Sequence, residues 1–389
     1  MSVTQPDMTR PSVSALIITY NQEKSIAQAI ESALMQQVNF HYEILIGEDC
    51  STDGTRSTVQ DYAAKHPGRI RALLHPQNLG PAHSPGKNNF VSTLKACRGE
   101  YVALLEGDDY WIFPHKLQKQ VDFLESHPEC AICFHNVMVF WEDGRQPPRE
   151  MCPADQKEIS TLEDLLRANF IPTCSVMFRN GLVREFPGWY YKLRMGDWTP
   201  YILLAQYGKI GHINEVMAAY RVHRGGVWNA ANNAERLGAT LQAYGCFNMH
   251  FAFKYERPIM GGVSKCLDEW AESFVDQGVA AVSVDQVAQS VTAIFENPPP
   301  GLRRMNAHKS KTLGRFYAVT AMMSYQAGNL PRVRYSLSRA LRYDVSWLRN
   351  RGIWSIGIEA LFGRGLAVRL RHGAAMLTGL RKSNVAPSE

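Results

Sequence analysis

The chain has 389 residues and a formal net charge of +6, with 45% hydrophobic and 20% charged residues. This is the composition of a globular protein with a sizeable core and room for two domains, and it excludes a low-complexity chain. The first residues lack the pattern of a signal peptide, and no apolar stretch reaches the roughly 20 residues of a membrane-spanning helix. We expect the eight scattered cysteines to be reduced thiols in a cytosolic protein, rather than disulfides or a zinc site.

Strands and helices alternate in the first part of the chain. Buried strands are predicted by four β-rich apolar runs, VSALIIT (13–19), YEILIGE (42–48), IRALLH (70–75) and YVALLE (101–106). Apolar residues at helical spacing between these runs predict amphipathic helices, the first of which would begin after a cap at Ser25. Such alternation is typical of an α/β fold in which helices cover both faces of a mostly parallel sheet.

Further elements follow along the chain. We expect a helix after Pro114, a strand or edge hairpin at 130–140, and a surface loop over EDGRQPPRE. From about residue 236 the pattern is helical, and residues 315–344 resemble a single helix-hairpin unit. The predicted organisation is an α/β domain at 1–235, a helical region at 236–345 and a basic amphipathic tail at 346–389.

The tail is strongly basic. Residues 349–382 carry seven Arg or Lys residues against one acid, Glu359, with apolar residues between them. This pattern suits an amphipathic helix on anionic lipid, although several glycines weaken the helix, and a tail packed on the rest of the protein is an equal alternative. No nucleic-acid recognition motif accompanies the charge, so we expect no nucleic-acid partner.

Acidic residues gather where two of the predicted strands end. Glu48 and Asp49 follow the second strand, and LLEGDDYW places Glu106, Asp108 and Asp109 after the fourth. Ligands of an open parallel sheet bind beyond the carboxyl ends of its strands, and carboxylates suit Mg²⁺ or Mn²⁺. One acid alone would more often cap a helix and face solvent. Two clusters at the same edge favour a ligand site.

The order of these motifs is similar to that of a known family. ITYNQE, EDCSTDGT, NLG, LLEGDDYW, and GDW followed by YRVH resemble, over roughly residues 12–228, the successive motifs of the family 2 inverting glycosyltransferases. The resemblance implies a GT-A fold and the transfer of a sugar from a nucleotide-diphosphate donor to an acceptor hydroxyl. The domain at 1–235 would then be the catalytic domain.

The resemblance also implies donor contacts. ITYN matches the element that lines the base and ribose, and this implicates Thr19, Tyr20 and nearby Glu23. Asp49 stands where the family's carboxylate contacts the base, which would be uracil by family frequency. Lys87 and Asn89 follow a Gly- and Pro-rich loop that would reach the donor phosphates.

A metal and a catalytic base complete the implied site. EGDD matches the family's D-x-D-D element, so Asp108 would bind the metal. Glu106 and Asp109 would lie at the donor, where Glu106 would contact either the metal or the sugar. His223 in YRVH would return to the diphosphate or metal. Asp197 in MGDW stands where the family keeps its base, although Gly replaces the usual Glu before it; otherwise Asp197 would simply begin a helix. Trp111, Trp189 and Trp198 would stack on sugars or belong to the core.

The sequence therefore predicts a metal-dependent hexosyltransferase, with Mg²⁺ or Mn²⁺ as its cofactor. The donor would be a nucleotide-diphosphate sugar, and the acceptor a saccharide or lipid-linked saccharide of cell-surface polysaccharide or glycoconjugate assembly. The protein would be cytoplasmic, with peripheral contact to the inner face of the membrane. The alternatives are a non-catalytic nucleotide-sugar-binding protein and, with less support, a glycoside hydrolase, which also uses two carboxylates. A nucleotidyltransferase would need a Gly- and Lys-rich loop that the N-terminal region lacks.

Overall fold

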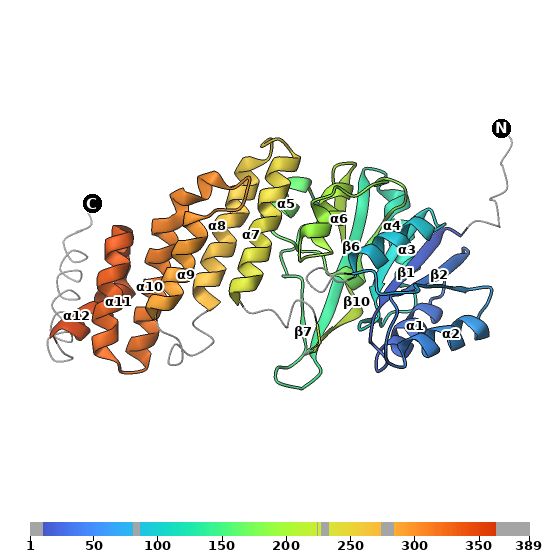
Figure 1. Cartoon of the computed structure of the whole chain (residues 1–389), viewed down its shortest axis with the longest axis horizontal. Helices are drawn as coiled ribbons and strands as arrows, with labels where there is room; N and C mark the ends of the chain where they lie inside the picture. The colour runs from blue at the N-terminus through green and yellow to red at the C-terminus, as the bar shows by residue number, and fades with distance from the viewer. Residues whose placement is uncertain (1–10, 81–85, 224, 227–232, 274–283, 363–389) are drawn as a thin grey trace, which may run out of the picture. The chain divides into compact units, whose positions relative to one another are not determined.

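The computed structural model describes residues 11–80, 86–223, 225–226, 233–273 and 284–362 (Figure 1). They form two compact units. The first unit takes the chain up to Asn232 together with His250–Ile259, and the second takes Asn233–Met249 and the chain from Met260 on.

The first unit is built on one ten-stranded sheet. In spatial order its main strands are β3 (Ile70–Leu74), β2 (Tyr42–Glu48), β1 (Val13–Thr19), β4 (Tyr101–Glu106), β9 (Met177–Arg179), β6 (Cys130–Trp141), β10 (Lys209–Val222) and β5 (Tyr110–Trp111). The short strands β7 (Arg149–Glu150) and β8 (Ile159–Ser160) pair with β6 and β10. The expected strand at 130–140 is confirmed as β6, which lies inside the sheet between β9 and β10. The expected surface loop over EDGRQPPRE ends in the short strand β7, which pairs antiparallel with β6.

Parallel pairing aligns the carboxyl ends of the first strands. β3, β2, β1 and β4 are parallel neighbours, as are β6 and β10. Thr19 at the end of β1 pairs with Glu48 of β2, and Ile18 pairs with Glu106 of β4. The predicted mostly parallel sheet is confirmed, and the residues after these strands emerge at one edge.

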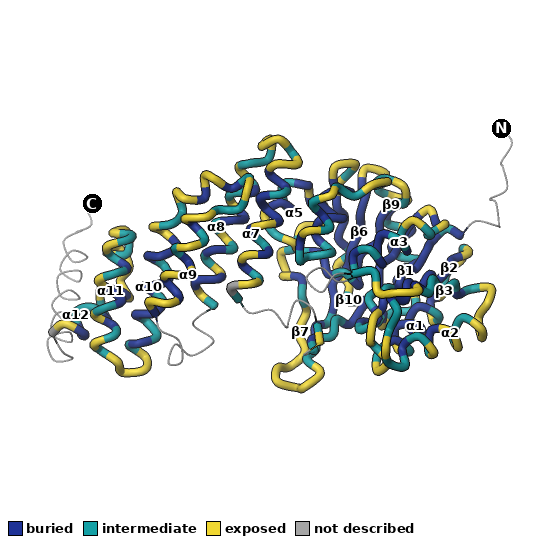
Figure 2. Tube along the Cα trace, viewed as in Figure 1, coloured by how far each residue is buried: buried dark blue, intermediate teal, exposed yellow. Residues whose placement is uncertain are grey.

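Helices cover both faces of the sheet. They are α1 (Ile26–Leu34), α2 (Thr55–Lys65), α3 (Lys87–Ala96), α4 (Lys116–Ser126), α5 (Leu162–Arg167) and α6 (Trp198–Leu204). Alternate strand residues such as Ile44 and Ile46 share a buried core with the apolar faces of α1, α2 and α4. Gly47 points to the opposite face, where α3 packs so closely that a Cβ would overlap Thr93 and Asn89. Figure 2 shows the sheet strands as largely buried.

One predicted detail of α1 is wrong. Ser25 occupies the N-cap position, but its side chain makes no capping hydrogen bond and donates instead to the backbone oxygen of Gln22 at 3.4 Å. The predicted apolar face is buried nonetheless, with Ile26, Ala29 and Ile30 fully covered. Packing against the sheet therefore specifies this helix more than its cap does.

The second unit is helical in the part described. Its helices are α7 (Asn233–His250), α8 (Glu256–Ser273), α9 (Val284–Glu296), α10 (Lys309–Gln326), α11 (Leu330–Tyr343) and α12 (Arg351–Phe362), of which the end of α7 and the start of α8 belong to the first unit. The predicted hairpin is α10 and α11, with Asn329 capping α11 through the backbone N–H of Arg332 at 3.1 Å. Within the described ranges, no helix combines the length and apolar character needed to cross a bilayer. Of the predicted basic tail, residues 363–389 lie outside the described residues.

Candidate active site

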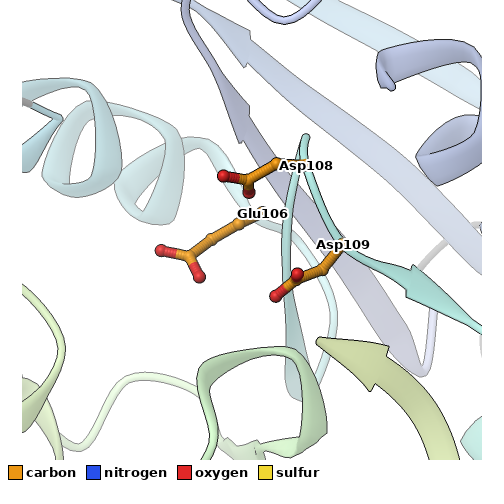
Figure 3. A group of neighbouring side chains, drawn as sticks. All are labelled: Glu106, Asp108 and Asp109. Atoms are coloured by element: carbon orange, nitrogen blue, oxygen red, sulfur yellow. The ribbon is translucent and has the colours of Figure 1, made fainter. Parts of the chain in front are cut away.

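Three acidic side chains meet just after β4. One carboxylate oxygen from each of Glu106, Asp108 and Asp109 lies within 4.8 Å of the others, and Figure 3 shows the three side chains on one side of the connection between β4 and β5. Burial, followed by the charge of Asp108, raises the pKa of Glu106 and of Asp109 well above its ordinary value. Because like charges are held together where water is scarce, this arrangement favours a cation or a proton.

Asp109 is held at one oxygen by a backbone N–H, and the Cys174 thiol is also a hydrogen-bond neighbour of its carboxylate. Its Oδ1 accepts a hydrogen bond from the backbone N–H of Arg221 at 2.8 Å. Its Oδ2 is buried and, among the described residues, receives no hydrogen bond from an N–H or O–H group. A buried carboxylate oxygen without an N–H or O–H partner is rare in native structures and fits a ligand site.

β10 brings two more side chains to the acidic cluster. His223, directly after β10, lies with Nε2 3.0 Å from Oδ2 of Asp108, and this contact raises the pKa of the imidazole. Arg221 donates from Nε to the backbone oxygen of Asp108 at 2.8 Å. The sequence reasoning missed Arg221, although it stands within the YRVH motif next to the predicted histidine.

The segment after β1 is tied to the segment after β2. Thr19 is buried, and its hydroxyl donates to Oε1 of Gln22 at 2.8 Å. Glu23 accepts from the backbone N–H of Gly54 at 2.8 Å, just before α2. Tyr20 is 42% exposed. These predicted donor contacts therefore gather at the edge where β1 and β2 end.

The two acids after β2 differ in their surroundings. The buried Glu48 carboxylate pairs with Arg56 and accepts from the backbone N–H of Ser51 at 2.6 Å, so it holds the loop that follows β2. Asp49 is also buried, and its Oδ1 accepts from the backbone N–H of Leu79 at 2.8 Å. Burial raises the pKa of Asp49.

Lys87 and Asn89, predicted at the donor phosphates, use their polar groups within the protein. The Asn89 amide donates to the backbone oxygen of Gly47 at 2.8 Å, and its Oδ1 lies 3.1 Å from Nε2 of His75. Lys87 donates from Nζ to the backbone oxygens of Tyr190, at 3.0 Å, and of Leu193. Donor contact stays a prediction for both residues.

Asp197 stands between the 190–196 segment and α6. It occupies the N-cap position of α6, but its side chain makes no capping hydrogen bond. Its Oδ2 accepts from the side-chain amide of Asn169 at 3.1 Å, a partner that no sequence motif indicated. Burial raises the pKa of Asp197, while hydrogen bonds, including that of Asn169, and last the charge of Lys87 lower it.

Electrostatic interactions connect Asp197 with the acidic cluster. The charge of Asp197 raises the pKa of Glu106. Burial raises the pKa of the Tyr201 and Tyr220 phenols, and the negative charges of Asp197 and Glu106 each raise both pKa values further. Asp197 therefore lies within interaction range of the cluster, as a shared site requires.

The three tryptophans separate into two groups. Trp111 is 1% exposed and donates from Nε1 to the backbone oxygen of Cys174 at 2.9 Å, while Trp198 is 2% exposed and donates to that of Leu165 at 3.1 Å. Both are therefore core residues and are not available for sugar stacking. Trp189 is half-buried, and its ring meets that of His250 edge-on at 5.6 Å.

Comparisons with known proteins identify the family of the chain. Residues 14–185 match the family model described as Glycosyl transferase family 2. An uncharacterized protein of Mycobacterium tuberculosis is 38% identical over 241 residues, which cover 59% of this chain and 67% of that protein. The putative teichuronic acid biosynthesis glycosyltransferase TuaG of Bacillus subtilis is 30% identical over 231 residues, which cover 57% of this chain and 85% of TuaG.

A solved structure has the same fold. S. aureus TarS 1–349, in complex with UDP-GlcNAc, superposes with a TM-score of 0.54 at 17% identity, over 87% of this chain and 92% of that chain. The fold, with acids at the carboxyl edge of its sheet, defines a glycosyltransferase of the GT-A type. The chain belongs to glycosyl transferase family 2, and its relatives include a protein named for teichuronic acid biosynthesis.

Proposed function

We propose that this protein transfers a sugar from a nucleotide-diphosphate donor, of the uridine type, to an acceptor hydroxyl with inversion at the anomeric carbon. The observation that carries the proposal is the gathering of Glu106, Asp108 and Asp109 after β4, where one carboxylate oxygen from each lies within 4.8 Å of the others. The charge of Asp197 also acts on Glu106. A base for the acceptor and a group of acids for the departing diphosphate would then face one space.

The donor would lie along the carboxyl edge of the sheet. In this proposal Thr19, Tyr20 and Glu23 line the nucleoside on one side and Asp49 accepts from the base. This is supported by the interlocked segments after β1 and β2, which bring these side chains to one edge. The diphosphate would extend toward the end of β4, where Glu106, Asp108 and Asp109 lie.

The acidic cluster fits a divalent cation. Three carboxylates within 4.8 Å offer hard oxygen ligands, and the buried Oδ2 of Asp109 lacks an N–H or O–H partner among the described residues. Oxygen donors of this kind suit Mg²⁺ or Mn²⁺. Asp108 and Glu106 would hold the ion, with His223 beside Asp108. When bound, such an ion neutralises negative charge on a leaving diphosphate.

Asp197 would act as the general base. It takes the proton of the acceptor hydroxyl while the hydroxyl oxygen bonds to the anomeric carbon. The bond between that carbon and the donor phosphate oxygen breaks, and its electron pair leaves with the nucleoside diphosphate. A single in-line displacement inverts the configuration and needs no covalent sugar intermediate.

A donor screen with one substitution tests this proposal. Purified protein is incubated with nucleotide sugars, Mn²⁺ and candidate saccharides, and release of nucleoside diphosphate is followed. We expect Asp197→Asn to lower kcat by roughly 10² to 10⁴-fold, because a positioned base contributes about that much, with donor affinity kept. The exposed Asp155→Asn serves as the matched control.

Each other outcome supports a different function. Donor binding without turnover in the wild type would favour a nucleotide-sugar-binding protein. Cleavage of glycosides without any nucleotide would favour a hydrolase. Full turnover by Asp197→Asn would remove Asp197 as the base.

The acceptor and the location are proposed from the relatives and the chain's charge. A role in cell-surface polysaccharide assembly is supported by similarity to TuaG, whose name includes teichuronic acid biosynthesis. The acceptor would then be a saccharide or lipid-linked saccharide. Contact with the inner face of the membrane through residues 346–389 is supported by their excess of basic over acidic residues.

A further inference from the structure

Lys87 is a buried cation that the proposed chemistry does not use. It is the first residue of α3 and follows Gly86, whose φ is +79°. Its side chain is 2% exposed, and Nζ donates to the backbone oxygen of Tyr190 at 3.0 Å and to that of Leu193. Nζ also lies 5.1 Å from the centre of the Tyr190 ring. A buried ammonium is stable only with such partners.

Both carbonyls belong to the segment that leads to Asp197. The Tyr190 hydroxyl donates to the backbone oxygen of Gly196 at 3.1 Å, so the segment is closed on itself directly before Asp197. A Cβ built on Gly196 would lie 3.8 Å from Cγ of Lys87. The lysine stem therefore supports this segment while its ammonium binds the carbonyls at 190 and 193.

The charges of Lys87 and Asp197 influence each other. Burial lowers the pKa of Lys87 to about 8, and Asp197 opposes that shift. In turn, Lys87 lowers the pKa of Asp197, which burial raises. With a pKa of about 8, Lys87 is mostly protonated at neutral pH, so it favours the ionised carboxylate that a base requires.

We propose that Lys87 is a positioning residue that holds the 190–196 segment and keeps Asp197 ionised, rather than a contact of the donor phosphates. The inference rests on the proposed function, because there Asp197 is the base. Lys87 would act through Asp197 and touch neither donor nor acceptor.

Removal of the Lys87 charge distinguishes positioning of Asp197 from contact with the donor phosphates. We expect Lys87→Met to lower kcat roughly 10-fold or more while donor KM changes less than about threefold, because a misplaced base affects the transition state and not the bound donor. Lys95→Met, an exposed substitution on the same helix, is the control. A phosphate contact would instead raise donor KM.

The pH profile provides a readout that loss of packing alone would not move. The titratable groups that interact with Asp197 are Lys87, Glu106, Tyr190, Tyr201 and Tyr220, in addition to the hydrogen bond from Asn169. Lys87 is the cation of this set, so its loss should let burial raise the pKa of Asp197 further. The acid limb of kcat, where Asp197 ionises, should move to higher pH in Lys87→Met and stay in place in Lys95→Met.

NMR titration of the Asp197 carboxyl carbon measures the same shift without any substrate. A higher Asp197 pKa in Lys87→Met than in the wild type supports the inference even if no donor is turned over. Absence of turnover in the wild type would overturn the proposed function but not this inference. An unchanged Asp197 pKa would overturn the inference. So would a raised donor KM with unaltered kcat.

Discussion

At the scale of single residues, the site is built from charges that the fold brings together at some loss of stability. Glu106, Asp108 and Asp109 would separate in water, yet β4 and the turn after it hold them within 4.8 Å. Asp108 has an opposing partner in His223, whose ring lies 3.0 Å away. Oδ2 of Asp109 receives no hydrogen bond from the N–H or O–H groups of the described residues. Such strain is typical of functional sites.

The contact between Asp108 and His223 gives a prediction for the metal-free protein. His223 has a raised pKa because its ring faces the Asp108 carboxylate, so its charged form should persist to higher pH than in a free histidine. In Asp108→Asn we expect the His223 pKa to fall toward or below its ordinary value, as followed by NMR of the ring nitrogens. The same variant should lose metal-dependent turnover.

Asp122→Asn is the control for this titration, because Asp122 lies on α4 and its carboxylate accepts from Gln118 at 2.8 Å. It should leave both the His223 pKa and turnover as in the wild type. An unchanged His223 pKa in Asp108→Asn would mean that the two side chains do not interact in solution. Full turnover with unaltered metal dependence would remove Asp108 as a metal ligand.

At the scale of elements, the sheet and α3 form the surface on which the site stands. Asn89 of α3 bonds to Gly47 of β2, and its Oδ1 also lies near His75 after β3. The same helix begins at Lys87, which holds the segment before Asp197. One helix thus connects the carboxyl edge of the sheet with the segment that precedes Asp197.

Gly47→Ala tests how closely α3 must approach β2. A Cβ at Gly47 would overlap the Thr93 hydroxyl and the Asn89 amide oxygen. We expect a loss of roughly 1–3 kcal/mol in the free energy of unfolding, as is usual for overpacking, measured by chemical denaturation. Gly68→Ala is the control, because nothing lies within 4 Å of its Cβ position, and it should change stability little. Equal stability of both variants would contradict this packing.

The sequence predicted those features that depend on local pattern. Continuous apolar runs predicted β1, β2 and β4 with their observed bounds, because buried parallel strands need such runs. The acidic residues followed from their place after those strands. The sequence could not tell whether Trp111 or Trp189 is a core residue, because only packing from distant segments buries Trp111. The partners of Lys87 lie about a hundred residues away, and no periodicity connects them.

At the scale of the whole molecule, the end of the helical unit offers a surface of a different kind. α12 packs on α11 through buried residues that include Ile353 and Ala360. Its other side carries Trp354, 52% exposed, and Leu361, 61% exposed. The exposed Arg349 and Arg351 lie next to this side in the chain. Exposed apolar groups among cations fit an anionic lipid surface.

Binding to vesicles tests this surface in the full-length protein. We expect cosedimentation with vesicles that contain phosphatidylglycerol, weaker binding to pure phosphatidylcholine, and release by salt, because the basic residues contribute through charge. The double variant Trp354→Ser and Leu361→Ser should bind at least roughly 10-fold more weakly, since full burial of each apolar side chain contributes about 1.5–3 kcal/mol. Tyr207→Ser, at a residue 62% exposed in the first unit, is the control.

The basic residues that follow α12 allow the contribution of residues 363–389 to membrane binding to be compared with that of α12. Arg364, Arg369, Arg371, Arg381 and Lys382 follow α12 in the chain. If their replacement by Gln abolishes binding while the double variant binds normally, the contact belongs to residues 363–389 and not to α12. If the wild type does not bind anionic vesicles at all, the membrane proposal fails. The proposed transfer of sugar to an acceptor would not be contradicted by that result.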